Sequence, residues 1–386
     1  MKNCQIGVYY WLNILHSLHY RERIDKMKIY NFSAGPAMLP EDVMKIAQAE
    51  FCNFKDSGSG LVELSHRGKQ FTEVIERAVA NVKELMNISD DYSVMFIQGG
   101  ASMQFAMLAM NLLGDKVADY ADTGVWSNKA YKEAANLGKA RIVCSSKEDK
   151  YAYIPDFAKW EATPADAAYL HITSNNTVAG TQYRVFPKVD KNVPLIADMS
   201  SDIMSREVNV NDFGMIYAGA QKNLGPSGMA VVIMRNDLIE RTPANLPTML
   251  KYATYSENNS LYNTPPTFAI YLLALVTDWI KAQGGIAAIE KINDAKAAKL
   301  YDFLDSSSYY STPVQKESRS RMNVVWRLPS EELDAQFVKE ATAAGLTQLK
   351  GHRIVGGCRA SIYNAMPMAG VDALIDFMKD FEKRNG

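Results

Sequence analysis

Residues 214–234 read GMIYAGAQKNLGPSGMAVVIM, and this stretch carries the strongest evidence for the fold and for a functional site. Two short apolar runs, 214–217 and 229–234, flank a segment of small residues that contains one lysine, Lys222. The Gly-Pro-Ser-Gly segment at 225–228 is typical of a turn. We therefore expect two neighbouring antiparallel strands, with Lys222 directly after the end of the first.

Five more β-branched or apolar runs precede this stretch. Several of them lack polar alternation, which indicates strands that are covered on both faces. Because helical or loop segments separate most of the runs, the pattern predicts an α/β fold with a mainly parallel, seven-stranded sheet and right-handed crossovers. The predicted strands are 93–97, 116–120, 141–144, 168–173, 194–198, 214–217 and 229–234.

Helical patterns flank the predicted sheet in the sequence. Pro40, Glu41 and Asp42 are typical of a helix start, and apolar residues then recur at helical spacing as far as Phe51 and Phe54. From Pro266 onward the pattern changes to that of a compact α+β unit. The further predicted elements are helices 69–86, 266–282, 286–304, 331–344 and 368–383, and strands 322–328 and 346–349.

These patterns divide the chain into four parts. We predict an atypical N-terminal extension at 1–26, a segment at 27–40 that packs with the small domain, a large domain at 41–282 and a small C-terminal domain at 283–386. The apolar run in the extension is too short to span a bilayer and lacks the cleavage site of a signal peptide. We interpret residues 1–26 as upstream sequence that packs poorly.

Composition limits the classes of function. The chain is 47% hydrophobic and 22% charged, which is ordinary for a globular protein. A net charge of −1 gives it no general attraction to nucleic acid or membranes, so an anionic ligand must be held by local cations. The four cysteines are scattered and the histidines show no metal-binding spacing. We therefore expect a cytoplasmic enzyme with reduced thiols and no metal.

Three polar clusters follow predicted strands, at the sheet edge where α/β proteins bind ligands. Residues 98–102 (QGGAS) offer backbone N–H groups to a phosphate, although an ordinary tight turn has the same sequence. Asp198 ends a strand, where a carboxylate either caps a helix or holds a proton on a pyridine nitrogen. Lys222 is either a solvated surface cation or an amine that forms a Schiff base.

Together, a phosphate cradle, a carboxylate and a lysine at neighbouring strand ends describe a pyridoxal-phosphate site. Trp126 follows one strand and is placed to stack on a ring, and Thr173 follows another and is placed to bond a ring hydroxyl. Either residue alone is more typical of packing or a turn. The combination predicts a pyridoxal-phosphate enzyme in which Lys222 carries the cofactor.

A second set of residues is cationic. His66-Arg67 and His352-Arg353 are repeated dipeptides beside glycine, and Arg359 follows six residues after the second. Arginine binds carboxylate or phosphate through paired hydrogen bonds, and histidine adds a donor near neutral pH. Surface salt bridges are the alternative for any one of these residues, but the repetition favours an anion pocket.

The chain resembles the phosphoserine aminotransferases, which are fold-type I pyridoxal-phosphate enzymes. The resemblance covers essentially everything from Met27 to the end, and SHRGKQF and GHR with the later arginine are specific to that family. The matching segments are NFSAGPAMLP (31–40), SHRGKQF (65–71), FIQGGASMQF (96–105), ADTGVWS (121–127), IADMSSDI (196–203), YAGAQKNLGPSG (217–228), YNTPPTF (262–268) and GHRIVGGCRASIYNAM (351–366).

The resemblance implies amino transfer from glutamate to 3-phosphohydroxypyruvate, giving O-phosphoserine and 2-oxoglutarate in serine biosynthesis. It leaves open the use of 4-phosphohydroxythreonine in pyridoxine biosynthesis. The implied cofactor contacts are Lys222 through a Schiff base, Asp198 at the ring nitrogen, Trp126 on the ring face, Thr173 at the ring hydroxyl, and Ala101, Ser102 and Gln221 at the phosphate.

The resemblance also implies substrate contacts and a homodimer with shared active sites. Asn263 and Thr264 would reach the cofactor phosphate of the neighbouring subunit, and Arg359 would bind the substrate α-carboxylate. The phosphate of the substrate, or the side-chain carboxylate of glutamate, would be held by His66, Arg67, His352 and Arg353.

Three other functions compete with this prediction. An alanine– or serine–glyoxylate aminotransferase would share the fold, but it has no need of two His-Arg pairs. A non-catalytic binder of phosphate ligands would have no need of Lys222 with Asp198. A nicotinamide-dependent enzyme would require a GxGxxG turn after an early strand, which the sequence lacks.

Overall fold

The computed structural model describes residues 29–386, so the predictions for 1–26 and for the start of the 27–40 segment lie outside the described residues. Its central feature is a seven-stranded sheet in the order β2-β10-β9-β8-β5-β3-β4. The strands are β2 (Tyr92–Gln98), β3 (Val117–Asp122), β4 (Lys139–Ser145), β5 (Tyr169–Thr173), β8 (Leu195–Asp198), β9 (Met215–Gly219) and β10 (Met229–Arg235).

The predicted α/β fold with a mainly parallel sheet is confirmed. Strand β10 runs antiparallel to both of its neighbours, β2 and β9, whereas the other neighbouring strands are parallel. The Gly-Pro-Ser-Gly turn therefore reverses the chain as predicted. Each of the seven strands lies within two residues of its predicted limits.

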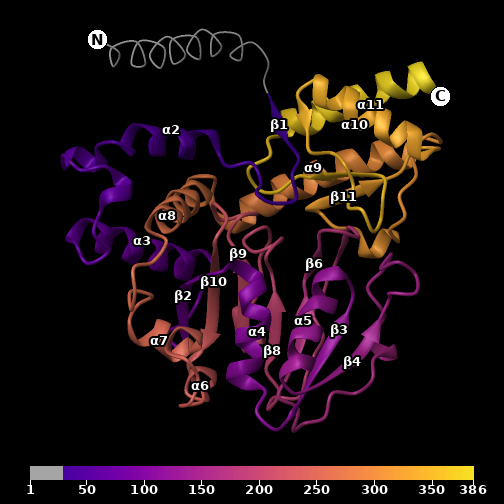
Figure 1. Ribbon diagram of the computed structural model, residues 1–386. Helices are drawn as coiled ribbons and strands as arrows, with labels where there is room; N and C mark the ends of the chain where they lie inside the picture. The colour runs from indigo at the N-terminus through magenta and orange to yellow at the C-terminus, as the bar shows by residue number, and fades with distance from the viewer. Residues whose placement is uncertain (1–28) are drawn as a thin grey trace, which may run out of the picture.

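The sheet is apolar because helices cover both of its faces. Along β2, Val94 and Phe96 belong to the core that contains residues of α3 (Lys69–Leu85) and α8 (Thr267–Ala282). The alternate residues Met95 and Ile97 face α4 (Gly100–Leu112) and α5 (Val125–Leu137), which lie in front of the sheet in Figure 1. Because strand side chains alternate between faces, both sets must be apolar.

The C-terminal residues form a second core beside the sheet domain (Figure 1). This core includes Phe32 from the N-terminal segment, which is completely buried. The elements are α9 (Gly285–Ser306), β11 (Asn323–Trp326), α10 (Glu331–Ala343), β12 (Leu346–Thr347), β13 (Cys358–Ser361) and α11 (Met368–Asn385), with β1 (Tyr30–Asn31) parallel to β12.

Helix α9 contacts both units. Ile286 and Ile289 pack in the core of the sheet domain, whereas Leu300 and Leu304 pack in the C-terminal core. The predicted domain boundary at residue 283 therefore falls just before a helix that joins the two cores. We keep the division into 41–282 and 283–386 as a proposal.

One local prediction was wrong, and one strand was missed. The helix that begins at Glu41 ends at Glu50 (α2) instead of continuing to Phe54, which is buried in a short 3₁₀ turn at Phe54–Asp56. Lys55 in that turn has a φ of 47°, which ends any helical path. Strand β13 was not predicted, because its sequence CRAS has no β-branched residue and follows two glycines.

The remaining elements are short. They are β6 (Asn175–Asn176), β7 (Thr181–Gln182), α6 (Asn236–Ile239) and α7 (Tyr252–Glu257). Within residues 29–386, no single helix has the length and hydropathy needed to cross a membrane, and α8 and α9 satisfy those criteria only as a pair bent by 81°.

Lys296 fixes the chain that follows β13. Its ammonium group is fully buried on α9 and donates to the carbonyl oxygens of Ile362, Tyr363 and Met366 at 3.0, 2.7 and 3.0 Å. These residues are buried, so the lysine supplies hydrogen bonds that water cannot, although the carbonyl of Tyr363 also accepts from the N–H of Met366 at 3.0 Å. The lysine thus replaces the secondary structure that the segment lacks.

The substitution Lys296→Met should lower the free energy of unfolding by about 3 kcal/mol, because it leaves buried carbonyl oxygens without donors. Urea denaturation followed by circular dichroism measures the change. Lys299→Met is the matched control: this lysine lies one turn away, is half-exposed and pairs with Asp372, so its loss should cost under about 1 kcal/mol. Equal effects of the two substitutions would contradict this role of Lys296.

Candidate active site

A cavity of about 500 Å³ lies at the carboxyl ends of the sheet strands, where open α/β folds bind ligands. Residues of the sheet domain and of the C-terminal unit line it together. Eight of the predicted site residues line this cavity: Ala101, Ser102, Trp126, Asp198, Gln221, Lys222, His352 and Arg359.

Lys222 follows β9 directly and forms part of the cavity wall. Burial lowers the pKa of its amine, while the carboxylates of Asp198 and Asp202 act in the opposite direction. A lowered pKa increases the fraction of neutral amine, which is the form that attacks an aldehyde. The position of Lys222 therefore suits a Schiff-base lysine.

Asp198 ends the neighbouring strand β8, and its residue is only 5% exposed. Its Oδ1 accepts hydrogen bonds from the backbone N–H of Ser200 at 2.9 Å and from the Ser200 hydroxyl at 2.5 Å. The same hydroxyl oxygen accepts from the N–H of Gly219 at 2.9 Å, at the end of β9. Burial raises the pKa of the Asp198 carboxyl, and Lys222 and Ser200 lower it.

Ser200 was not predicted from the sequence. Its hydroxyl orients the Asp198 carboxylate at the end of β8 and also bonds Gly219 at the end of β9, so it connects the two strand ends. The Asp-x-Ser spacing was the available signal, because a serine two residues after an aspartate commonly bonds to it within a turn.

The predicted phosphate cradle is the N-terminus of α4. Gly99 has a φ of 93°, and a Cβ atom there would lie 2.8 Å from Cβ of Met103, so only glycine suits the position. Its N–H donates to the carbonyl of Gly228 at 3.1 Å, which joins the cradle to the turn before β10. Ala101 and Ser102 lie in the first turn of the helix, whose free N–H groups favour an anion.

Trp126 and Arg359 reach the cavity from opposite units and share one contact residue, Thr177. The indole Nε1 of Trp126 donates to the Thr177 hydroxyl at 3.1 Å, and Arg359 Nη1 donates to the Thr177 carbonyl at 3.1 Å. Thr177, in the loop between β6 and β7, was also missed by sequence reasoning. Burial lowers the pKa of Arg359, whose Nε has no partner among the described residues.

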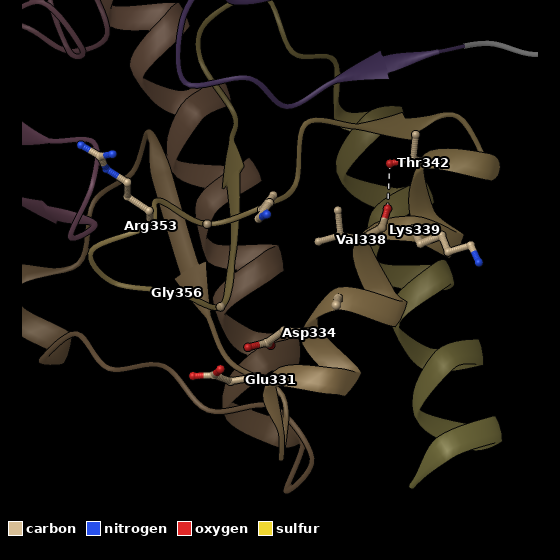
Figure 2. Close-up of a pocket in the computed structure, with 11 residues that line it drawn as sticks. Glu331, Asp334, Val338, Lys339, Thr342, Arg353 and Gly356 are labelled. Carbon is tan, nitrogen blue, oxygen red and sulfur yellow. Dashed lines mark hydrogen bonds between the residues drawn. The ribbon is translucent and has the colours of Figure 1, made fainter.

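Six predicted site residues do not line this cavity. Thr173 lies beside Asp198 in the β5–β8 register and is buried. Arg67 is exposed and His66 half-buried in the loop before α3, and Asn263 and Thr264 are exposed before α8. Arg353 belongs to the lining of a separate cavity of about 620 Å³, which Glu331 and Asp334 of α10 also line, and its side chain points away from these two carboxylates (Figure 2).

The residues of the first cavity fit pyridoxal phosphate. A lysine, a fixed carboxylate and a helix N-terminus are present together, as the cofactor's aldehyde, ring nitrogen and phosphate require. Two buried polar atoms of lining residues, Gln221 Oε1 and Arg359 Nε, have no hydrogen-bond partner among the described residues. Because such atoms are costly to leave unpaired, they are consistent with a polar ligand.

The fold and this site define a pyridoxal-phosphate-type aminotransferase. The family model described as aminotransferase class-V matches residues 29–374, so the chain belongs to that family. Within it, the chain belongs to the phosphoserine aminotransferases, because the curated protein of that name from Desulfosudis oleivorans is 54% identical over 93% of this chain and 99% of its own length.

Two solved structures of phosphoserine aminotransferases are similar over nearly the whole chain. The protein from Bacillus circulans subsp. alkalophilus is 48% identical, with a TM-score of 0.91 over 93% of this chain and 99% of that one. The pyridoxal-phosphate-bound protein from Trichomonas vaginalis is 39% identical, with a TM-score of 0.87 over 91% of this chain and 100% of that one.

Ser200→Ala should weaken the binding of pyridoxal phosphate about tenfold, because a hydrogen bond to a charged group contributes roughly 1.5–3 kcal/mol. Titration of the apoprotein with the cofactor, followed by tryptophan fluorescence, measures the affinity. Ser145→Ala is the control, since that hydroxyl bonds Asp122 at 3.0 Å and does not line the cavity. Unchanged affinity in Ser200→Ala would show that the hydroxyl does not orient Asp198.

Proposed function

We propose that the chain is a phosphoserine aminotransferase that uses pyridoxal phosphate to move an amino group from glutamate to 3-phosphohydroxypyruvate. O-phosphoserine and 2-oxoglutarate are the products. The observation that carries the proposal is the placement of Lys222 and Asp198 at neighbouring strand ends of one cavity, together with Arg359. The family membership and the full-length similarity to phosphoserine aminotransferases support it.

Each residue then has a role. The cofactor, when bound, supplies an electron-accepting ring that stabilises negative charge at the substrate α-carbon. Asp198 would hold a proton on the ring nitrogen, Trp126 would lie on the ring face and Thr173 would bond the ring hydroxyl. Lys222 would hold the cofactor through its amine and would move a proton at the substrate α-carbon, for which a lowered pKa suits the amine.

The substrate is held by cations. The planar guanidinium of Arg359 suits the α-carboxylate, and its position is fixed through Thr177. His352 lines the same cavity, where burial and the nearby charges of Arg359 and Arg353 lower its pKa, so it can donate a hydrogen bond to the substrate as a neutral imidazole. Both substrates are anionic at their other end, through a phosphate or a side-chain carboxylate, and one cationic pocket serves both half-reactions.

We propose that a homodimer completes this pocket, in the cytoplasm. His66, Arg67, Asn263 and Thr264 lie outside the cavity of their own chain, and apolar side chains are exposed beside them. Val62 is 52% exposed near Arg67, and Tyr262 is 48% exposed next to Asn263. Such a surface suits a second copy of the chain, whose residues would then reach across to the shared site.

The substrate prediction is tested with purified holoprotein. Phosphoserine with 2-oxoglutarate should react with a kcat/KM at least about a hundredfold above that for alanine with glyoxylate, because only the phosphorylated substrate engages the cationic pocket. Lys222→Ala should abolish both turnover and the visible absorbance of the cofactor complex, whereas Lys132→Ala, an exposed lysine of α5, should change neither. Comparable efficiency on alanine would refute the proposed substrate.

The shared site is tested by complementation. Lys222→Ala and Arg67→Ala should each be inactive as pure proteins, but their co-expressed mixture should recover up to about a quarter of the wild-type rate, since half of the dimers are hybrid and each holds one intact site. If Arg67 serves its own chain, no hybrid site is intact. A mixture without activity would therefore overturn the sharing of the site.

A further inference from the structure

The segment that follows Asp198, residues 199–206, is buried along its whole length and joins the two units of the fold. Asn223, next to Lys222, donates to the carbonyl of Ile203 at 3.2 Å. From the C-terminal unit, Asn364 Nδ2 donates to the carbonyl of Met204 at 2.9 Å and Asn293 Nδ2 to that of Ser205 at 3.0 Å. The segment therefore has a fixed position next to the candidate active site, whose cavity Ser200 lines.

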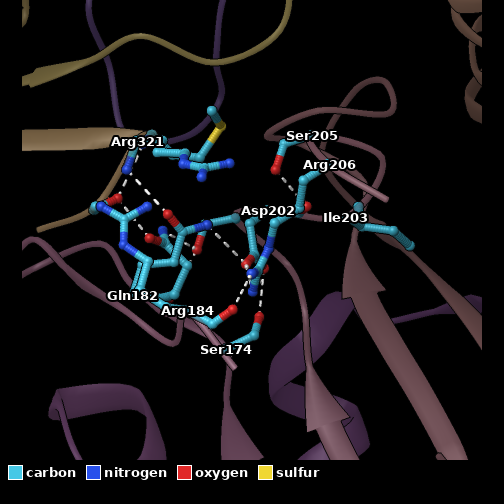
Figure 3. Close-up of polar contacts among 12 residues, drawn as sticks. Ser174, Gln182, Arg184, Asp202, Ile203, Ser205, Arg206 and Arg321 are labelled. Atoms are coloured by element: carbon cyan, nitrogen blue, oxygen red, sulfur yellow. Dashed lines mark hydrogen bonds and ion pairs between the residues drawn. The ribbon is translucent and has the colours of Figure 1, made fainter. Parts of the chain in front are cut away.

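Asp202 lies in the middle of this segment and is 3% exposed. Figure 3 shows its carboxylate among side chains from three different parts of the chain. Oδ1 accepts from the hydroxyl of Ser174, and Oδ2 accepts from Gln182 Nε2 at 3.1 Å. Gln182 Oε1 in turn accepts from the N–H of Arg321 at 3.0 Å, at the start of the C-terminal strands.

The hydrogen bonds alone do not require a charge at this position. Ser174 Oγ lies 3.1 Å from the carbonyl oxygen of Asp198 and is oriented to donate to it. A neutral amide could replace the carboxylate without losing these bonds. Its N–H would donate to the Ser174 hydroxyl, which would then donate to the carbonyl of Asp198. Its oxygen would accept from Gln182 Nε2. Because a buried carboxylate is costly in free energy, its presence instead of an amide calls for a reason.

The charge of Asp202 is only partly compensated. The Arg206 guanidinium is its ion-pair partner among the described residues, with Nη2 at 3.6 Å from Oδ2. Arg206 also donates to the carbonyl of Arg184 at 3.2 Å and lies over the ring of Phe186. The negative charge of Asp202 acts on the cavity as well: it raises the pKa of both Lys222 and Asp198.

We propose that Asp202 is a positioning residue of the active site, whose buried negative charge balances the cations of the cavity and sets the protonation state of Lys222. The inference rests on the proposed role of Lys222 as the cofactor lysine. Asp202 touches neither substrate nor cofactor; it acts through Lys222 and through the strand end that carries Asp198. Asp202 is thus a second carboxylate close to the site. It is held by residues of the sheet domain and, through Gln182, by Arg321 of the C-terminal unit.

The charged and titratable groups around Lys222 fix the sign of the effect. Asp198 and Asp202 favour its protonated form, and Arg359 disfavours it. His352 lines the same cavity, and Tyr217 lies beside Asp198 in the β8–β9 register. Burial raises the pKa of Tyr363; the charge of Arg359 lowers that pKa and the charge of Asp202 raises it. Removing the charge of Asp202 should therefore favour the deprotonated lysine nitrogen. Removing Arg206, the ion-pair partner of Asp202, should favour the protonated one, because the charge of the carboxylate is then less offset.

The experiment is a pH titration of the visible absorbance of the holoprotein, which reports the protonation of the bond between Lys222 and the cofactor. Asp202→Asn should lower the midpoint by roughly one pH unit. The acid limb of the kcat/KM profile for phosphoserine should move in the same direction. Arg206→Met, which keeps the side-chain volume but removes the compensating cation, should raise the midpoint.

The control is Asp119→Asn. Asp119 is a fully buried aspartate of β3, paired with Arg141 through two hydrogen bonds, and does not line the cavity. Its substitution should lower thermal stability without moving the midpoint. If Asp202 had only a structural role, Asp202→Asn would likewise lower thermal stability and leave the midpoint unchanged. An unchanged midpoint in Asp202→Asn would therefore overturn the inference.

Shifts of Asp202→Asn and Arg206→Met in the same direction would also overturn it, because the proposal requires opposite signs. If Asp202→Asn does not fold, the upward shift in Arg206→Met still decides the question. A wild-type protein without visible absorbance after loading would instead refute the proposed function. The failure of the function and the failure of the inference are thus separate results.

Discussion

The site depends on one electrostatic constraint: a lysine and an aspartate are buried together at the ends of neighbouring strands. Asp198 ends β8 and Lys222 follows β9, and the two strands are parallel neighbours. Burial disfavours the charged form of each residue, while each charge favours the other. The balance keeps the amine less basic than a surface lysine without leaving an isolated charge in the protein.

The rest of the fold serves to hold these two strand ends in register. Because helices cover both faces of the sheet, a shift of one strand along its neighbour would disrupt the close packing of its side chains on both sides. The antiparallel strand β10 returns the chain beside β9 and brings the turn at Gly228 against Gly99. The phosphate cradle is therefore tied to the same strand pair that positions Lys222.

The sheet was predictable from the sequence, because fully covered strands leave continuous apolar runs and the chemistry lies at their ends. The residues that orient the site were not. Ser200 and Thr177 each act through a few hydrogen bonds made by turns, which leave little trace in a pattern of residue types. Strand β13 forms through its pairing with β11 across a long stretch of sequence, so Arg359 could be placed only by its motif.

The position of Arg359 also explains why the cavity needs both units of the fold. Arg359 lies on the C-terminal strand β13, but its guanidinium donates to Thr177 in the sheet domain, which also bonds Trp126. The group that suits the substrate carboxylate is thus linked to the group that suits the cofactor ring. The buried segment 199–206 makes a second link on the other side of the strand ends, through Asn293 and Asn364. With both links in place, a displacement of either unit would move substrate contacts and cofactor contacts together, which is what a reaction between two bound molecules requires.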